Sequence, residues 1–450
     1  MTDRLECDVL VVGAGASGVP AAIAAARSGA SVVLLEDDST PGGAPVDNYV
    51  TYPCGNPKTG IYREMVRRID ARYRMPSAHR ASTARREEDW YLPWAYSLVI
   101  GEMLHAEKDN LTILCNVRAD EPLMRQEGRT PCVKGIVAHK SDRTELRIES
   151  AVTLDATGTG TIARLAGCQE MYGRNARDEF DEPLAPEQGD ARVQHVTLMF
   201  FSQRLGTRPF DMRQLQIVGM IDPGFGWVDK DPEAFVARDT GFYLHWGVAL
   251  PCDDTRDEQA VATAQAEAWQ RIRPDLDTLW ENGFFVYVAP RIGVRETRRI
   301  VGEHVLSEND LRSGVMPEDV IALGHHFIDL WGHKLSQDQR TIPPFGVPYR
   351  CLLPKGVDGL LLAGKTLSCS HIGLGPARVQ PTVAAAGQAA GVAAAQAAAD
   401  GFQPRDVEVP RLQRELRKPT QALCLDPETM PGEVWEEQFV VPASAGCRSA

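Results

Sequence analysis

Short apolar runs and helical patterns alternate at the start of the chain. Residues 8–12 (DVLVV) are apolar and mostly β-branched after the first residue, a pattern typical of a buried parallel strand. Residues 19–28 favour a helix that Gly29 ends, and residues 31–35 (SVVLL) form the next apolar run. Two strands joined by a crossover helix predict a parallel α/β sheet.

The same pattern returns twice further along the chain. Residues 151–154 form a strand that enters a glycine turn at 155–160, and a short helix follows to residue 166. Residues 359–363 (GLLLA) form another buried strand, and we expect a loop over 365–380 after it. Both strands are predicted to extend the sheet begun by residues 8–12.

A long alanine-rich helix follows that loop. It begins at Pro381, a residue well suited to the first helical position, and its composition favours helix strongly. Gly387 and Gly391 lie four residues apart and share one helix face. We expect that face to pack closely against the sheet.

The remaining patterns predict smaller elements around this sheet. The predicted elements are a β-meander from strands at 111–115, 133–138 and 145–149, helices at 61–74, 88–107 and 256–281, an aromatic strand region at 284–290, and an exposed acidic loop at 174–190. The fold class is therefore α/β, with a Rossmann-like domain of parallel sheet plus β-meander and an inserted α+β domain.

The domain boundaries follow from these elements. The Rossmann-like domain takes residues 1–172, including a helical cap segment at 46–107, and resumes at 341–402. The inserted substrate domain takes 173–340. The proline-bearing tail at 403–450 is expected to pack in an extended form or to serve as an oligomer arm.

The first glycine loop indicates a dinucleotide site. Gly13, Gly15 and Gly18 give G-x-G-x-x-G between a strand and a helix, and Glu36 closes the next strand. The first glycine permits a tight turn, the second lets the backbone approach a pyrophosphate, and the third lets the helix pack on the strand. The free N–H groups of the helix N-terminus favour phosphate, and Glu36 is placed to accept hydrogen bonds from a ribose.

Two further features favour FAD over NAD as the ligand. Gly42 and Gly43 follow the acid in one short loop, where backbone can run along a bound cofactor. The N–H groups near residues 378–383, at the start of the alanine-rich helix, form a second anion site. A reduced flavin carries negative charge that a helix N-terminus stabilises, whereas nicotinamide has no comparable need.

Composition and charge exclude several classes of function. The formal net charge of −13 disfavours nucleic acid and an anionic membrane face as partners. The ten cysteines include no C-x-x-C pair, so a zinc ribbon, an iron–sulfur cluster or a redox dithiol has no support. Scattered thiols and the absence of an apolar span indicate a cytoplasmic protein with reduced cysteines.

The motifs together resemble a known family. They are VVGAGASG, LLEDDSTPGG, DATGTGTIARLAG, RETRRIVGEHVL, VPYRCLLP, LLLAGKTLSCSH and ARVQPTVAAAGQAAG. Their order is similar to that in FAD-dependent oxidoreductases related to the flavoprotein subunits of fumarate reductase and succinate dehydrogenase. The resemblance implies a glutathione-reductase-type FAD domain. The segment HGANR of the dicarboxylate reductases is absent, which speaks against succinate or fumarate as substrate.

The resemblance also implies which residues contact FAD. The implied contacts are Gly13, Gly15, Ser17, Gly18, Glu36, Gly42, Gly43, Val117, Ala156, Thr157, Gly158, Gly364, Gly375, Arg378 and Val379. This sequence has Thr159, Lys365 and Gln380 where Asp, Arg and Met are common in such proteins. No departure removes a glycine, so the expected cofactor remains FAD.

Three side chains are candidates for catalysis. His371 lies between the strand end at Gly364 and the alanine-rich helix, and is the first candidate for a base; a structural loop histidine is the alternative. Arg298 is a candidate for binding an anionic substrate or tuning the flavin, with a salt bridge to Glu296 or Glu303 as the alternative. On a strand, Arg295 and Arg299 would share the face opposite Arg298.

His326 is a candidate for the substrate pocket, together with its neighbours in HHFIDLWGH. The spacing of His325, His326 and His333 is poor for zinc, so no metal is expected.

The function predicted is an FAD-dependent oxidoreductase that moves a hydride between a small organic substrate and flavin N5. A flavin monooxygenase is an alternative, although Ala363-Gly364-Lys365 stands where that class carries a Gly-Asp motif. A nucleotide-linked dehydrogenase without flavin and a noncatalytic FAD-binding or RNA-modifying protein are the others. The sequence identifies neither the substrate nor the electron acceptor, and a homo-oligomer remains open.

Overall fold

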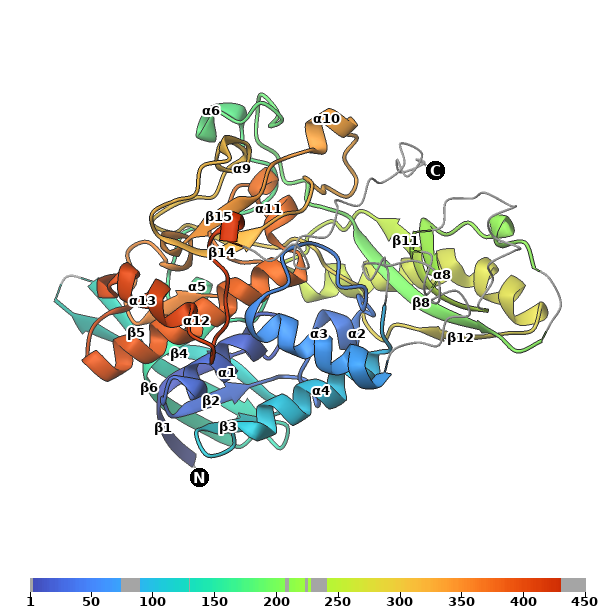
Figure 1. Cartoon of the computed structure of the whole chain (residues 1–450). Helices are drawn as coiled ribbons and strands as arrows, with labels where there is room; N and C mark the ends of the chain where they lie inside the picture. Colours follow the sequence, from blue (N-terminus) through green and yellow to red (C-terminus); the bar gives the residue numbers. More distant parts are fainter. Residues whose placement is uncertain are drawn as a thin grey trace.

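The largest sheet among the described residues has seven strands and lies at the lower left in Figure 1. The structure is a computed structural model that describes residues 3–73, 90–128, 130–206, 210–222, 226–227 and 241–429. The strands of this sheet are β1 (Asp3–Val12), β2 (Val32–Leu35), β3 (Leu111–Leu114), β4 (Val117–Glu127), β5 (Thr130–Lys140), β6 (Glu145–Asp155) and β16 (Leu360–Leu362). Their order is β3-β2-β1-β6-β5-β4, with β16 paired to β6.

Strand β6 joins a parallel part of the sheet to an antiparallel part. On one side it pairs in parallel with β1 along its length. On the other side it pairs first with β5, in antiparallel, and then with β16, in parallel. The two strands predicted at 145–149 and 151–154 are therefore one strand. The parallel arrangement of β1, β2 and the strands around 151–154 and 359–363 is confirmed.

The predicted membership of the β-meander is wrong at one strand. Residues 111–114 form β3, which pairs in parallel with β2 at the sheet edge. The third antiparallel strand is β4, which pairs with β5. Its sequence, VRADEPLMRQE, gives no apolar run because much of this strand is exposed to solvent.

Two alanine-rich helices pack directly on each other beside this sheet. They are α1 (Gly18–Arg27) and α12 (Gln380–Asp400). A β-carbon at Gly387 would lie 2.2 Å from the carbonyl oxygen of Ser17, and one at Gly391 would lie 2.1 Å from that of Ala21. The glycine face of α12 therefore contacts α1, and the prediction that it packs on the sheet is wrong.

The second sheet is antiparallel and lies to one side of the first (Figure 1). Its order is β10-β9-β11-β8-β12, from β8 (Val196–Arg204), β9 (Gly219–Asp222), β10 (Gly226–Trp227), β11 (Phe242–Leu250) and β12 (Phe284–Val288). Helix α8 (Glu258–Glu281) packs on it and buries Ala264, Ala268 and Ile272 against its apolar residues. The predicted helix at 256–281 and the aromatic strand region are confirmed.

The described part of the chain also contains two strand pairs and nine further α-helices. The pairs are β7 (Glu170–Met171) with β13 (Arg299–Ile300) and β14 (Val320–Gly324) with β15 (Phe345–Pro348). The helices are α2 (Ala44–Asp47), α3 (Gly60–Tyr73), α4 (Pro93–Ala106), α5 (Thr161–Leu165), α6 (Arg177–Phe180), α9 (Glu308–Ser313), α10 (Gln337–Arg340), α11 (His371–Ala377) and α13 (Val409–Leu416). Helices α3 and α4 match two predicted helices, apart from the part of the prediction at 74–89, which lies outside the described residues.

Three predicted loops or tails differ from the structure. Residues 371–377 form α11 instead of a loop, because the Ser370 side chain caps it by accepting from the Gly373 N–H at 2.9 Å. The acidic segment at 174–190 contains α6 and buries Glu182, whose carboxylate accepts from the Glu308 N–H at 2.7 Å.

The tail is also more ordered than predicted. Its helix α13 buries Leu412 and Leu416 in the main core, so this part is not an extended arm. Residues 430–450 lie outside the described residues. In the described part of the chain, every helix is too short or too polar to cross a bilayer.

Candidate functional site

One cavity of about 1480 Å³ connects the glycine turns of the large sheet to the second sheet. Its wall includes the turn after β1, the turn after β6, the residues after β16 and the N-terminus of α12. The loop from His325 to Leu335 also lines it. Carboxyl ends of parallel strands therefore meet the cavity, as expected for a ligand site in an α/β sheet.

The first glycine turn leaves open space in one place only. A β-carbon at Gly13, which has φ +102°, would lie 2.4 Å from the carbonyl oxygen of Ala156, and one at Gly18 would lie 1.8 Å from that of Gly13. A β-carbon at Gly15 would meet nothing within 4 Å, and Gly15 lines the cavity. Two glycines thus hold the turn tight, and the third leaves room for a pyrophosphate to approach the backbone.

Two uncapped helix N-termini open into this cavity. Helix α1 begins after Ser17 and helix α12 begins after Val379, and neither cap residue makes a side-chain cap hydrogen bond. Neither helix has an acidic residue in its first turn. Both therefore offer free N–H groups and partial positive charge to an anionic ligand.

Glu36 supports the glycine turn. Its carboxylate accepts a hydrogen bond from the Ala14 N–H at 2.7 Å and from the Asp38 N–H at 3.2 Å. Burial, with a smaller contribution from Asp37, raises the pKa of Glu36 to about 8. The side chain also lines the cavity, and the ribose contact stays a prediction.

The turn after β6 is organised by a buried carboxylate. Asp155 accepts hydrogen bonds from the Thr157 hydroxyl at 2.6 Å and from the Ala163 N–H at 2.9 Å. These bonds place Ala156, Thr157 and Gly158 on the cavity wall.

Most of the predicted cofactor residues are brought together on this wall. The lining includes Gly13, Gly15, Ser17, Glu36, Gly43, Val117, Ala156, Thr157, Gly158, Gly364, Arg378 and Val379. Gly18, Gly42 and Gly375 stand behind it: the Gly42 N–H donates to the Ala14 carbonyl at 2.8 Å, and a β-carbon at Gly375 would lie 3.2 Å from the Asp329 nitrogen. These three glycines shape the wall instead of forming its surface.

The part of the cavity lined by the loop at 325–335, here called the inner end, is rich in cations and aromatic rings. Arg378 pairs with Asp329 at 2.9 Å, and Arg340 lies 3.6 Å from the same carboxylate. Asp329 also accepts from the Trp331 indole at 3.0 Å. Burial would raise the pKa of Asp329, but the neighbouring cations, Arg378 first, hold that pKa below its usual value.

His326 and His333 both line the inner end. Burial lowers the pKa of each to about 4, so both imidazoles are neutral at pH 7. Asp329 opposes this shift at His326, because its negative charge favours the imidazolium.

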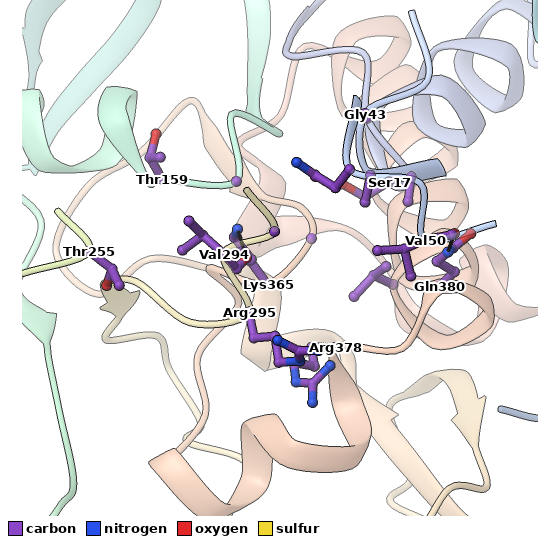
Figure 2. Close-up of a pocket in the computed structure, with 18 of the residues that line it drawn as sticks. Ser17, Gly43, Val50, Thr159, Thr255, Val294, Arg295, Lys365, Arg378 and Gln380 are labelled. Atoms are coloured by element: carbon purple, nitrogen blue, oxygen red, sulfur yellow. Dashed lines mark hydrogen bonds between the residues drawn. The ribbon is translucent and has the colours of Figure 1, made fainter. Parts of the chain in front are cut away.

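Lys365 lies between the glycine turns and the inner end. Its ammonium donates to the Val294 carbonyl at 2.6 Å, and its Cε would be 3.6 Å from a β-carbon at Gly158. Burial, and then Arg378, lower the pKa of Lys365 to about 8. Figure 2 shows Lys365 beside Val294, with Arg295 and Arg378 on one side of it and Ser17 and Gly43 on the other.

His371 does not line the cavity. It is buried and bonds to Glu296 at 2.9 Å, and Glu296 also forms a buried ion pair with Arg299. The His371 ring packs edge-on against His333 at a centroid distance of 5.0 Å. His371 therefore lies behind the cavity wall and contacts a wall residue, His333, through its ring.

The three arginines of RETRR are not arranged as a regular strand would place them. Only Arg299 lies in a strand, where it is buried. Arg295 and Arg298 both line the cavity, so the prediction that Arg295 shares a face with Arg299 is wrong. Arg298 donates to the Thr159 carbonyl at 2.7 Å and pairs with Glu170 at 3.0 Å, so its salt bridge is with neither Glu296 nor Glu303.

Some cavity residues had no clear signal in the sequence. Asp329, Trp331 and Cys54 come from irregular loops, where no periodicity shows which way a side chain faces. The pair His325-His326 correctly indicated that this loop lines the cavity. It did not indicate that Asp329 forms ion pairs with Arg340 and Arg378.

Comparisons with known proteins agree with this geometry. Residues 8–416 match the family described as FAD dependent oxidoreductase. A stretch of 46 residues is 47% identical to the sarcosine oxidase subunit alpha of Rhizobium meliloti (strain 1021), covering 10% of this chain and 5% of that protein. The match thus spans a small part of that relative's length.

Solved structures with a similar arrangement are distant in sequence. A geranylgeranyl bacteriochlorophyll reductase-like protein from Thermoplasma acidophilum is 12% identical, with a TM-score of 0.45 over 92% of this chain and 84% of that one. The p-nitrophenol 4-monooxygenase of Pseudomonas putida DLL-E4 is 14% identical, with a TM-score of 0.38 over 95% and 91%. The family match spans nearly the whole chain, and the space left at Gly15 in the first glycine turn fits FAD. This chain therefore belongs to the FAD dependent oxidoreductase family and is an FAD-dependent enzyme.

Proposed function

We propose that this protein transfers a hydride between a small organic substrate, bound at the inner end of the cavity, and FAD. When bound, FAD supplies the hydride acceptor or donor. The observation that carries the proposal is the continuity of the cavity: the glycine turns and the inner end with its histidines and arginines share one space. A narrower relation to the fumarate reductase flavoproteins stays a prediction.

The residues proposed to hold FAD are those of the two glycine turns and the two helix N-termini. Gly15 leaves space beside the N-terminus of α1, which would bind the pyrophosphate. The N-terminus of α12 would stabilise negative charge on the flavin ring. Arg298 would act on this side of the cavity by fixing the turn at Thr159.

His326 is the proposed proton acceptor for the substrate. It lines the cavity, it is neutral at pH 7, and Asp329 is placed to stabilise the imidazolium that forms. His371 would act as a positioning residue: Glu296 orients its ring, and that ring packs on His333 of the cavity wall.

The proposal is tested by reducing the flavin with candidate substrates in the absence of oxygen. A panel of small organic acids, amines and alcohols is mixed with the FAD-loaded protein, and loss of flavin absorbance is followed. We expect at least one substrate class to bleach the flavin without any nicotinamide. A flavin that only NADH or NADPH reduces, followed by oxygen-dependent hydroxylation, would instead make the protein a monooxygenase.

A variant separates catalysis from binding. His326→Gln should slow flavin reduction about 100-fold or more, the usual effect of removing a positioned base, while FAD content stays unchanged. His105→Gln, at an exposed position of α4, is the matched control and should reduce at the wild-type rate. An unchanged rate in His326→Gln would remove His326 as the proton acceptor.

A further inference from the structure

Arg295 is held at the cavity wall by neutral groups. Its Nη1 donates to the His195 carbonyl at 2.9 Å and to the Thr197 hydroxyl. Its guanidinium lies over the Trp331 ring, 4.0 Å from the centroid. These contacts fix the plane of the guanidinium, and none of them is with a carboxylate.

The neighbouring arginines differ from Arg295 in this respect. Arg378 and Arg340 share the carboxylate of Asp329. Among the residues that the structure describes, Arg295 forms no ion pair, and only its Nη1 has hydrogen-bond acceptors. The bidentate edge formed by Nε and Nη2 is therefore unpaired in that part of the chain.

Burial of this charge is unfavourable unless an anion offsets it. Burial and the nearby Arg378 lower the pKa of Arg295 to about 9, so the guanidinium still carries its charge at pH 7. Arg295 is desolvated and lines the same cavity as Arg378, Arg340 and Lys365. The carboxylate near it, that of Asp329, is already shared by Arg378 and Arg340. A planar guanidinium with two adjacent free N–H groups matches the geometry of a carboxylate.

Lys365 also lacks a carboxylate partner among the described residues, but its position differs. It lies against Gly158 of the second glycine turn, on the side where the cofactor is proposed to bind. Arg295 lies against Trp331 and His195, at the inner end. Lys334 also lines this end but is exposed to solvent, so among the described cations buried at the inner end Arg295 is the one without an ion pair.

We propose that Arg295 binds the carboxylate of the substrate, and that the substrate is a small organic acid with one carboxylate at this end. The carboxylate accepts hydrogen bonds from Nε and Nη2 of Arg295, and Trp331 holds the guanidinium plane in place. This inference rests on the proposed function, because it names the substrate class for the same cavity.

Binding is measured on the FAD-loaded full chain, without any need for turnover. Acetate, propionate, benzoate and phenylacetate are titrated, and the change in flavin absorbance or fluorescence gives the affinity. Each acid is compared with its amide, which has the same shape and no charge, and with inorganic phosphate. We expect saturable binding of at least one acid, about 10-fold or more tighter than its amide and tighter than phosphate.

Variants locate the site. Arg295→Met should weaken binding of that acid about 10- to 100-fold, the range for losing hydrogen bonds to a charged group, and Arg295→Lys should recover part of it. Arg340→Met is the matched control: it removes a cation from the same end, but Asp329 keeps Arg378, so we expect a change within about threefold. FAD content should be equal in all four proteins.

The outcomes that overturn the inference are distinct from those that overturn hydride transfer. Acids that bind no tighter than their amides, or an Arg295→Met protein that binds them like wild type, would remove the carboxylate site. Phosphate binding as tight as that of the best acid would make it a general anion site, which also contradicts the inference.

If acids bind through Arg295 and no substrate reduces the flavin, the carboxylate site is supported and the proposed hydride transfer is contradicted. The comparison of acid with amide needs only the wild-type protein, so it decides even if a variant fails to fold.

Discussion

Gly387 of α12 lies directly against the Ser17 carbonyl, the point at which helix α1 begins. A β-carbon at Gly387 would be 2.2 Å from that oxygen, a distance that real side chains do not reach. The N-terminus proposed to bind the pyrophosphate and the helix proposed to stabilise the flavin ring are thus in backbone contact, although more than 350 residues separate them in sequence. The spacing of the two anion sites is set by this contact.

We therefore expect Gly387→Ala to destabilise the protein and to weaken FAD binding together. An added methyl group with no space costs about 1–3 kcal/mol of folding free energy, and it would push α12 away from α1. Thermal unfolding and FAD content measure both effects. Gly101→Ala is the control: Gly101 lies in α4 with nothing near its β-carbon, so alanine there should leave FAD binding unchanged and stabilise by up to about 1 kcal/mol.

The two alanine-rich helices also show what sequence could and could not predict. The glycine turn before α1 and the position of Pro381 fixed both N-termini correctly, because those signals are local. The partner of Gly387 and Gly391 was predicted wrongly. A glycine face indicates close packing, but it carries no information on whether a sheet or a helix fills the space.

The inner end of the cavity was harder to predict for the same reason. Strand periodicity grouped Arg295 with Arg299, but the backbone at 295–298 is irregular and turns Arg295 and Arg298 to the same cavity. Asp329 holds two arginines from a loop without any repeat pattern. Side-chain direction in such segments depends on tertiary contacts, which a local pattern does not contain.

Removing the carboxylate of Glu296 should destabilise the protein strongly. Glu296 and Arg299 are both fully buried, and Glu296 also bonds to His371. Burial would raise the pKa of Glu296, but His371 and Arg299 hold it below its usual value, so the carboxylate is charged at neutral pH. Glu296→Gln leaves the buried charge of Arg299 without its carboxylate partner, which costs about 3–5 kcal/mol.

Chemical denaturation measures this loss, and two further variants test its cause. Adding Arg299→Met to Glu296→Gln removes the stranded charge and should recover part of the stability. Arg271→Gln, which breaks an ion pair with Glu267 on the exposed face of α8, should cost less than about 1 kcal/mol. Equal losses from the buried and the exposed pair would contradict the argument.

Glu36 should make the stability of the FAD-free protein fall as pH rises. Burial raises its pKa from 4.5 to about 8 in the folded state. Between these two values the folded protein holds a proton that the unfolded chain has released, so rising pH favours unfolding, by up to about 1.4 kcal/mol per pH unit. Glu36→Gln keeps an acceptor for the Ala14 N–H and cannot ionise, so its stability should be flatter with pH. Parallel curves for the two proteins between pH 5 and 8 would show that Glu36 does not titrate in this range.

Lys365→Met should change stability in opposite directions with and without FAD. Burial lowers the pKa of Lys365 to about 8, so at pH 7 its charge is present at a cost to the folded state. Without FAD, methionine removes that cost, and the variant should unfold at a higher temperature than wild type.

With FAD, the variant lacks a cation beside the glycine turn at Gly158, so its dissociation constant for FAD should rise about 10-fold, as expected for a lost hydrogen bond to a charged group. Arg295→Met is the internal comparison, because it should weaken binding of the acid and leave the affinity for FAD unchanged. A Lys365→Met protein that binds FAD as tightly as wild type would place the lysine outside the cofactor side of the cavity.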